Sequence, residues 1–333
     1  MIEAYAALSE KGPLEPFTYE PGELKASEVE IAVHSCGICH SDVSMIENDW
    51  GLAQYPLVPG HEVIGEIRAL GPCVQNLERH QMVGLGWHAG YCQSCEMCQQ
   101  ADYNLCAQSQ PTIVGHHGGF AKVVRADARS VVPIPDGVDY SKMGPLLCGG
   151  ITVFNPLVQF NVKPTHRVAV IGVGGLGHMA IQFLHAWGCH VTAFTTSADK
   201  AKECMELGAD CVIHSEDTDA LEAAANSFDF MLSTVNVPLP WDEYLATLRP
   251  HGRLHFVGAV LEPLQFSLFP MLMKQLSISS SPVGSPQMIR KMLTFAKQHE
   301  IAPFVEKFAM CDVNEALAHL KAGKARYRLV LEN

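Results

Sequence analysis

The chain has 333 residues, of which 48% are hydrophobic and 17% charged, and its formal net charge is −12 at pH 7. This length and composition indicate a globular protein of two domains and exclude a disordered one. The acidic balance, without any basic run, argues against nucleic acid or an anionic membrane as a partner. No apolar stretch reaches the roughly 18–20 residues of a transmembrane helix.

Cysteine usage points to metal binding, since the chain has 12 cysteines and 16 histidines. Residues 1–5, Met-Ile-Glu-Ala-Tyr, carry an early acid and lack the basic-then-apolar pattern of a signal peptide. In a long chain without such a signal, closely spaced cysteines bind metal more often than they form disulfides. We therefore expect a reducing, cytoplasmic location.

Taken in chain order, the predicted elements change once, from short β-strands to strands that alternate with helices. Residues 1–145 are rich in glycine, proline and short β-type runs such as 29–33 and 63–67, which is typical of an all-β barrel or sandwich. From residue 168, strands alternate with amphipathic helices, which predicts a parallel α/β sheet. Strands are expected at 168–171, 191–194, 211–214, 230–233, 253–257 and 277–280, and helices at 176–187, 198–207, 286–298 and 313–322. The terminal run 328–331 should be a strand that returns to the first domain and completes its sheet.

Residues 169–178 read Ala-Val-Ile-Gly-Val-Gly-Gly-Leu-Gly-His, an apolar strand that runs into Gly-x-Gly-x-x-Gly and then a helix. Gly172 allows the tight turn, Gly174 lets the backbone approach a pyrophosphate, and Gly177 lets the helix pack on the strand. Gly175 and Leu176 complete the loop, and the helix N-terminus offers free N–H groups to the phosphates. In this context the motif predicts a dinucleotide site, against the alternative of a glycine-rich turn that binds nothing.

The end of the second predicted strand indicates which nucleotide binds. An NAD site usually places an acid there to bond the ribose hydroxyls, whereas this strand ends in Thr195, Thr196 and Ser197, followed by Lys200. Hydroxyl donors with a cation suit a 2′-phosphate, which an acid would repel. The sequence therefore favours NADP(H), with the alternative that Lys200 is only a solvated helix charge.

Four cysteines fall within fifteen positions, at Cys92, Cys95, Cys98 and Cys106. Thiolates on short loops can close a tetrahedral zinc site without an open position, so this lobe, residues 90–107, should hold a structural zinc. An iron–sulfur cluster is the alternative, although the x-x-x-Cys-Pro ending of its common bacterial spacing is missing.

Two further segments combine cysteine, histidine and acid: residues 36–42, Cys-Gly-Ile-Cys-His-Ser-Asp, and residues 60–65, Gly-His-Glu-Val-Ile-Gly. A third candidate is Cys148, where the two predicted domains join. Two Cys and one His with an open fourth position suit a catalytic zinc. Spacing alone does not select these three ligands among all the cysteines and histidines.

The order of these motifs resembles the zinc-containing medium-chain alcohol dehydrogenases, in particular the cinnamyl alcohol dehydrogenase branch and the bacterial broad-specificity NADPH-dependent aldehyde reductases within it. The resemblance covers essentially the whole chain, to the terminal Ala-Arg-Tyr-Arg at 325–328. It implies a GroES-like β-rich catalytic domain, residues 1–145 and 286–333, and a doubly wound Rossmann domain, residues 146–285, with the active site between them. It also implies two zinc ions per chain, NADP(H) as cofactor, and a homodimer.

The same resemblance assigns the metal site residue by residue. The catalytic zinc ligands would be Cys39, His61 and Cys148, with Glu62 as a second-sphere or exchanging carboxylate. Ser41 would be the first hydroxyl of a proton relay.

Other roles follow from the resemblance too. His40 would contact the pyrophosphate, Thr152 would neighbour the nicotinamide, and Arg328 would approach the cofactor phosphates, unless it is only a surface strand charge. Cys36 would be a buried packing residue. The substrate pocket would be lined by Trp50, Trp87 and His88, unless these are ordinary core residues.

One position departs from much of the family. The relay often ends in a His three residues after the hydroxyl residue, and here Ser44 stands at that place. Serine is no base near pH 7, although it can pass a proton through water. We therefore expect a more solvent-coupled relay. The neighbouring pair His116 and His117 lies in a loop context that does not favour metal binding.

The predicted activity is hydride transfer between NADPH and an aldehyde or primary alcohol, as in a broad-specificity aldehyde reductase. One alternative is an NAD-dependent polyol or alcohol dehydrogenase that works in the oxidative direction. An alternative of another class is a non-catalytic protein that senses nucleotides or redox state, although retention of three metal ligands argues against it.

Overall fold

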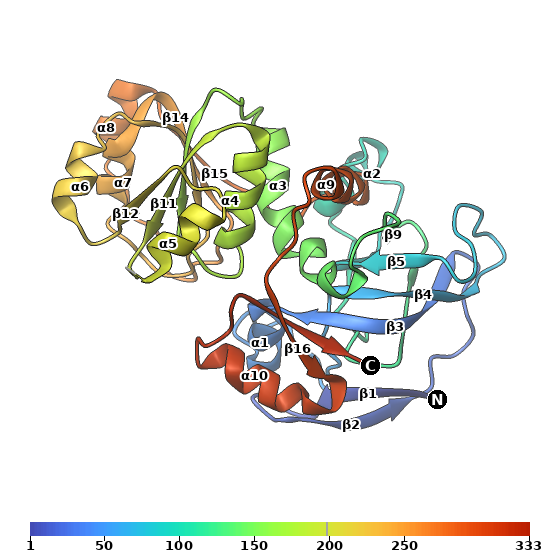
Figure 1. Ribbon diagram of the computed structural model, residues 1–333. Coiled ribbons are helices and arrows are strands. Elements are labelled where there is room, and N and C mark those ends of the chain that lie inside the picture. Colours follow the sequence, from blue (N-terminus) through green and yellow to red (C-terminus); the bar gives the residue numbers. More distant parts are fainter. Residues whose placement is uncertain (198) are drawn as a thin grey trace. The chain divides into compact units, whose positions relative to one another are not determined.

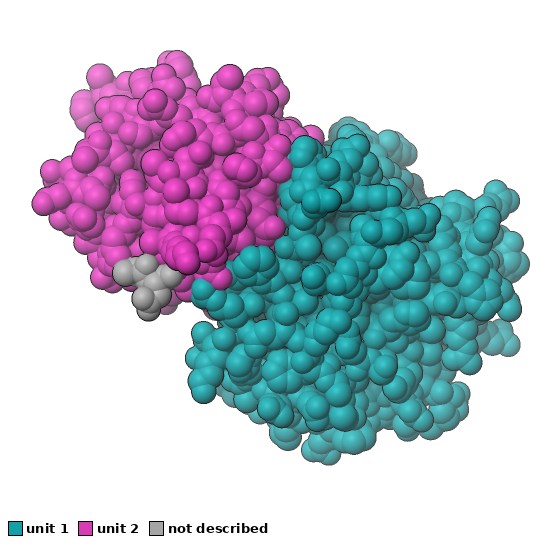
Figure 2. Space-filling model, in the orientation of Figure 1, with its two compact units in different colours: residues 1–151, 283–333 teal, residues 152–282 magenta. Residues whose placement is uncertain are grey.

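The structure is a computed structural model that describes residues 1–197 and 199–333. The chain divides into two compact units, one of residues 1–151 and 283–333 and the other of residues 152–282 (Figure 2). The sequence placed the domain limits at residues 145 and 286, and those limits stay a prediction.

The first unit is built on a seven-stranded sheet, in line with its short β-type runs (Figure 1). Its order is β16 (Val305–Ala309), β17 (Arg328–Glu332), β3 (Glu28–Ile38), β4 (Val63–Leu70), β5 (Met82–Leu85) and β9 (Val131–Pro133), with β8 (Val123–Asp127) paired to β3. Two small sheets join β1 (Ile2–Ala7) to β2 (Leu14–Tyr19) and β6 (His88–Gly90) to β7 (Gln110–Pro111). β17 pairs antiparallel with β3, so the chain's last strand does return to this sheet, as expected.

Short helical segments connect and cover these strands. They are α1 (His40–Glu47), α2 (Glu96–Gln99), α9 (Pro286–Gln298) and α10 (Val313–Lys321), with the 3₁₀ turns η1 (Tyr103–Leu105), η2 (Tyr140–Lys142), η3 (Gly144–Leu147) and η4 (Met310–Asp312). Helix α3 (Gly149–Gln159) contains the limit between the units. The core of this first unit is dominated by Val, Ile, Leu and Ala, many of them from alternating strand positions.

The second unit is a six-stranded, fully parallel sheet with helices on both sides (Figure 1). Its order is β12 (Cys211–His214), β11 (His190–Thr195), β10 (Arg167–Ile171), β13 (Phe228–Ser233), β14 (Leu248–Phe256) and β15 (Ser277–Ser280). Its helices are α4 (Gly177–Trp187), α5 (Asp199–Glu206), α6 (Thr218–Ala223), α7 (Trp241–Thr247) and α8 (Leu268–Lys274). The strand order reverses at β10, and this is where a doubly wound sheet binds its ligand.

The expected elements differ from the observed ones at a few ends. β14 begins at Leu248, five residues before the start expected at 253, because its first half contains Pro250 and His251, residues that read as a turn. His251 has a φ of 67°. The helix expected from residue 198 is described from Asp199, and Ala198 lies outside the described residues.

Candidate active site

Four potential metal ligands from distant parts of the chain meet in the first unit. The ligand atoms of Cys39, His61, Glu62 and Cys148 all lie within 4.8 Å of one another. Cys39 follows β3, and His61 and Glu62 precede β4. Because β3 and β4 pair antiparallel, the end of one strand lies beside the beginning of the next. Cys148 arrives from the end of η3.

The spacing of the donor atoms fits zinc. The sulfur atoms of Cys39 and Cys148 are 4.0 Å apart, and His61 Nε2 lies 3.3 Å from the Cys148 sulfur. A tetrahedral zinc, with bonds of about 2.3 Å to sulfur and about 2.0 Å to nitrogen, places its two sulfur ligands about 3.8 Å apart and a sulfur and a nitrogen ligand about 3.5 Å apart. The two thiols and the imidazole therefore already have the geometry of a zinc site.

Glu62 adds to this group a carboxylate oxygen that accepts no hydrogen bond from the described residues. One of its carboxylate oxygens pairs with the Arg328 guanidinium, while Oε2 is buried and has no hydrogen-bond partner among the described residues. A side chain at Gly37 would overlap that oxygen, so the glycine leaves room for it. Burial raises the pKa of Glu62, opposed by the charge of Arg328. A buried carboxylate oxygen without a donor suits a nearby cation.

Asp42 holds the histidine ligand in place, and the sequence interpretation missed it. Its Oδ1 lies 3.0 Å from His61 Nδ1 and accepts the Gly60 N–H at 2.8 Å, and its Oδ2 accepts the Cys39 N–H at 2.9 Å. The carboxylate is fully buried. With Nδ1 donating to Asp42, Nε2 is free to bind a metal. The available signal was an acid three residues after Cys39, at the third position of α1.

The ionisation of the ligands is tied to their neighbours. Burial lowers the pKa of His61, but the charge and hydrogen bond of Asp42 outweigh it and hold that pKa well above its usual value. The hydrogen bond with Cys148 lowers the pKa of Cys39, and the same bond raises the pKa of Cys148. The two thiols thus differ in how readily they lose a proton, and metal binding would require both of them as thiolates.

The four-cysteine lobe forms a second metal group in the same unit. The ligand atoms of Cys92, Cys95, Cys98 and Cys106 lie within 4.8 Å of one another. Cys92 sulfur is 3.9 Å from that of Cys98 and 3.5 Å from that of Cys106, close to the separation of about 3.8 Å in a tetrahedral Zn–S₄ centre. Backbone N–H groups of Ser94 and Cys95 lower the pKa of Cys92 to about 6, which favours the thiolate form that binds metal.

Several predicted neighbours of the catalytic group lie beside it. The Ser41 hydroxyl is 3.7 Å from the Cys39 sulfur. The Trp87 ring meets the His61 ring edge-on, with centroids 5.0 Å apart, and Trp50 packs on Trp87 at 6.0 Å. His88 instead packs on Tyr91 at 5.4 Å, and burial lowers its pKa to about 4.

The remaining predicted residues of the first unit are placed as follows. His40, the first residue of α1, is exposed, and Ser44 is half-buried one turn later. Cys36 is fully buried and donates to the Gly37 carbonyl at 3.6 Å, as expected of a packing residue. Arg328 is 6% exposed, so it is not a surface strand charge.

The glycine-rich turn lies at the carboxyl end of β10. Gly172 has a φ of 88°, a conformation that suits glycine. A side chain at Gly177 would overlap the Gly172 carbonyl, whereas one at Gly174 would meet open space. Gly175 and Leu176 follow, with Leu176 as the N-cap of α4. The turn can thus approach a pyrophosphate at the N-terminus of α4.

The polar turn after β11 lies next to this loop. Thr195 is buried, and its hydroxyl accepts the Ser197 N–H at 3.3 Å, while Thr196 is exposed. Lys200 donates to the Val173 carbonyl of the glycine-rich turn at 2.9 Å, so it is more than a solvated helix charge. Thr152, near the start of α3, is 9% exposed.

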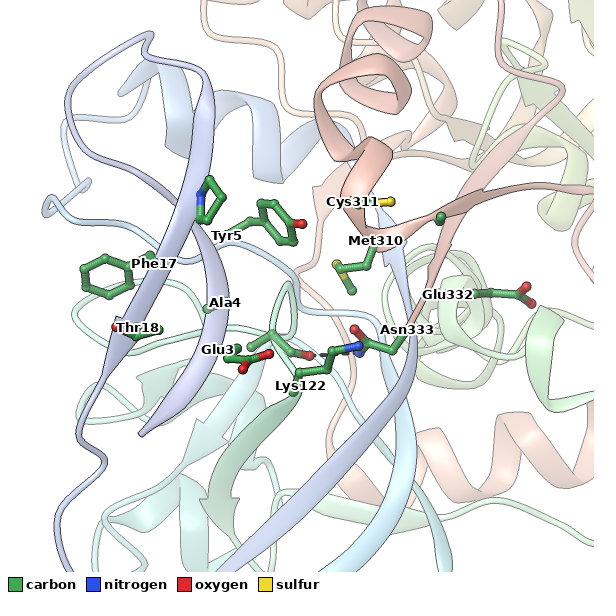
Figure 3. Close-up of a pocket in the computed structure, with 13 residues that line it drawn as sticks. Glu3, Ala4, Tyr5, Phe17, Thr18, Lys122, Met310, Cys311, Glu332 and Asn333 are labelled. Atoms are coloured by element: carbon green, nitrogen blue, oxygen red, sulfur yellow. Dashed lines mark hydrogen bonds between the residues drawn. The ribbon is translucent and has the colours of Figure 1, made fainter.

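Other concave or histidine-rich regions contribute nothing to the metal groups. A cavity of about 480 Å³ is lined by residues such as Tyr5, Lys122, Met310 and Cys311, and none of its lining residues belongs to either metal group (Figure 3). His117 packs on Tyr19 with centroids 4.1 Å apart. Within the described part of the chain, no helix is long and apolar enough to cross a bilayer.

The fold and the two metal groups together define a zinc-binding, dinucleotide-dependent oxidoreductase. Residues 25–136 match the alcohol dehydrogenase GroES-like domain and residues 175–298 match the zinc-binding dehydrogenase family.

Relatives agree over the full length. The chain is 56% identical to the aldehyde reductase AdhA of Synechocystis over 333 residues, which cover 100% of this chain and 99% of the relative. A cinnamyl alcohol dehydrogenase of Sorghum bicolor, SbCAD4, has a TM-score of 0.95 at 33% identity, covering 99% of this chain and 97% of that one. The CAD of Helicobacter pylori, solved in complex with NADP(H), has a TM-score of 0.91 at 26% identity, covering 99% and 97%. The chain belongs to the zinc-binding medium-chain alcohol dehydrogenase family.

Proposed function

We propose that the protein is an NADPH-dependent aldehyde reductase whose catalytic zinc is held by Cys39, His61 and Cys148. The observation that carries the proposal is the buried group of two thiols and one imidazole with zinc-like separations. The Synechocystis relative, at 56% identity, is named an aldehyde reductase, which supports the direction of the reaction. Zinc, when bound, is a Lewis acid that polarises a carbonyl and stabilises the negative charge that develops on its oxygen.

The chain's own residues would orient the substrate and move the proton. Trp87 and Trp50 would form an apolar wall beside His61 that excludes water, which supports a substrate with an apolar or aromatic body. Ser41, whose hydroxyl is 3.7 Å from the Cys39 sulfur, would give a proton to the product oxygen. Ser44, one turn further along α1, would pass that proton on through water, because it has no basic side chain.

The preference for NADPH rests on the turn after β11. Thr196 and Ser197 offer hydroxyls, Lys200 offers a positive charge at the glycine-rich turn, and no acid stands at the strand end. The H. pylori CAD complexed with NADP(H) supports the same choice. His40, Thr152 and Arg328 would lie toward the cofactor, and the charge of Arg328 would also oppose the rise that burial causes in the pKa of Glu62.

A panel of aldehydes with each nucleotide tests the proposal. We expect aromatic, branched and aliphatic aldehydes to be reduced with NADPH at a kcat/KM at least about tenfold above that with NADH, since charge-assisted bonds to a phosphate each contribute about 1.5–3 kcal/mol. Faster turnover with NADH, or alcohol oxidation with NAD alone, would instead identify an NAD-dependent alcohol dehydrogenase. Equal turnover of the zinc-free protein and of the same protein after zinc is restored would exclude zinc catalysis.

We also propose that the protein is a cytoplasmic homodimer. Four large apolar side chains of α8 are more than 60% exposed: Leu268, Phe269, Leu272 and Met273. β15 ends the parallel sheet, which leaves an open strand edge in the same unit. A second copy that covers this patch would bury both features. Light scattering should give twice the chain mass for the native protein and a single chain mass for Phe269→Asp combined with Leu272→Asp.

A further inference from the structure

The polar turn after β11 is held from the neighbouring strand by a residue that the proposed function does not use. In the parallel register of β11 and β12, Thr195 stands opposite His214, the last residue of β12. The His214 ring nitrogen Nε2 lies 2.9 Å from the Thr196 carbonyl oxygen. The Ser215 N–H donates to the Thr195 carbonyl at 3.0 Å, so the turn has two anchors on this side.

The hydrogen bonds determine the state of the His214 ring. A carbonyl oxygen can only accept, so Nε2 carries the hydrogen that it donates to Thr196. The Glu216 N–H donates to Nδ1 at 3.4 Å, so Nδ1 carries no hydrogen. The ring therefore acts as a hydrogen-bond donor to Thr196 through Nε2.

The other side of the turn is tied to the glycine-rich loop. The Lys200 ammonium donates to the Val173 carbonyl at 2.9 Å, and the Lys200 N–H donates to the Ser197 carbonyl at 3.2 Å. The His214 ring thus bonds the Thr196 carbonyl, and the Lys200 backbone N–H bonds the Ser197 carbonyl. The exposed Thr196 then presents its hydroxyl from a backbone that is fixed at its own carbonyl.

We propose that His214 is a positioning residue for NADP(H) selectivity. By holding the Thr196 carbonyl it orients the hydroxyls of Thr196 and Ser197 for the 2′-phosphate, and it touches neither the reacting atoms nor the pyrophosphate. This inference rests on the proposed preference for NADPH. Preorganised donors bind a phosphate better than donors that must be ordered during binding.

The test compares two nucleotide fragments, 2′,5′-ADP and 5′-AMP, by calorimetric titration of the full-length protein. The measured quantity is the dissociation constant of 5′-AMP divided by that of 2′,5′-ADP. This ratio isolates the contribution of the 2′-phosphate to binding. His214→Leu removes the donor and should reduce this ratio about three- to tenfold, the equivalent of one net hydrogen bond. His214→Gln, whose amide nitrogen can occupy the place of Nε2, should restore the ratio to within about twofold of the native value.

A matched control is His190→Leu, at the opposite end of β11, which should leave the ratio unchanged. In steady-state assays, His214→Leu should raise the KM for NADPH and leave kcat and the KM for NADH unchanged. A ratio within twofold of the native one in His214→Leu, or a failure of His214→Gln to restore it, would overturn the inference. If the native protein itself does not prefer 2′,5′-ADP, the proposed NADPH preference fails instead, so the two failures are distinguishable.

Discussion

Asp42→Asn is the sharpest perturbation of the catalytic metal group, because it changes one charge and almost no volume. The carboxylate accepts three hydrogen bonds: from Gly60 and His61 on Oδ1 and from Cys39 on Oδ2. An amide keeps only one acceptor atom. Its best orientation keeps the oxygen toward Gly60 and His61 and turns the NH₂ group toward the Cys39 N–H, which loses its acceptor.

Asp42→Asn should reduce both the stability of the fold and the affinity for the catalytic zinc. One unsatisfied N–H group next to a buried amide should lower the free energy of unfolding by about 1–3 kcal/mol. Loss of the carboxylate that orients the histidine should weaken zinc binding about 10- to 100-fold, or about 1.4–2.7 kcal/mol. The four-cysteine lobe shares no hydrogen bond with Asp42 in the described residues, so only one of the two zinc ions should be affected.

Zinc content after titration with a chromophoric chelator measures this directly. Native protein should release its two ions in two steps, and Asp42→Asn should release the catalytic ion at about 10- to 100-fold lower chelator concentration. Cobalt substitution provides a second readout, since cobalt held by two thiolates and an imidazole absorbs differently from cobalt held by the four thiolates of the other site. Asp127→Asn is the control, because Asp127 also accepts several hydrogen bonds, from Ser27 and Arg129, but lies outside both metal groups. Equal zinc affinity in folded Asp42→Asn and native protein would refute the reasoning.

Three further predictions concern stability and cofactor binding. Burial, helped by the charge of Arg253, lowers the pKa of His255 to about 4. The unfolded chain therefore binds the proton first, and the free energy of unfolding falls as the pH drops from about 6.5 toward 4. Urea unfolding at pH 5 should show a loss of about 2 kcal/mol that is absent in His255→Gln. Cys98→Ser should reduce zinc from two ions per chain to one and lower the free energy of unfolding by on the order of 4 kcal/mol, measured by metal analysis and denaturant titration. Gly177→Ala should lower it by about 1–3 kcal/mol because its methyl group meets the Gly172 carbonyl, whereas Gly174→Ala should keep the native stability and only weaken nucleotide binding in a fluorescence titration.

Local features of this protein could be read from the sequence alone. The strand, glycine-rich turn and α4 follow from contiguous residues, because a positive φ and a close backbone approach each require glycine at one position. The four-cysteine lobe spans only fifteen positions, so chain connectivity alone keeps its sulfurs close. The alternation of strands and helices was likewise enough to predict the parallel sheet, while the start of β14 at Leu248 was missed because its residues have turn propensity.

Contacts between distant segments were decided only by the tertiary structure. Arg328 and Glu62 are separated by 266 positions, and they pair because β17 and β4 both lie beside β3. Asp42 became a support for His61, and His214 an anchor for Thr196, through strand pairing that no local pattern encodes. Burial makes the pairing of Arg328 with Glu62 and of Asp42 with His61 necessary, because a charged or polar group removed from water must find its partner within the protein.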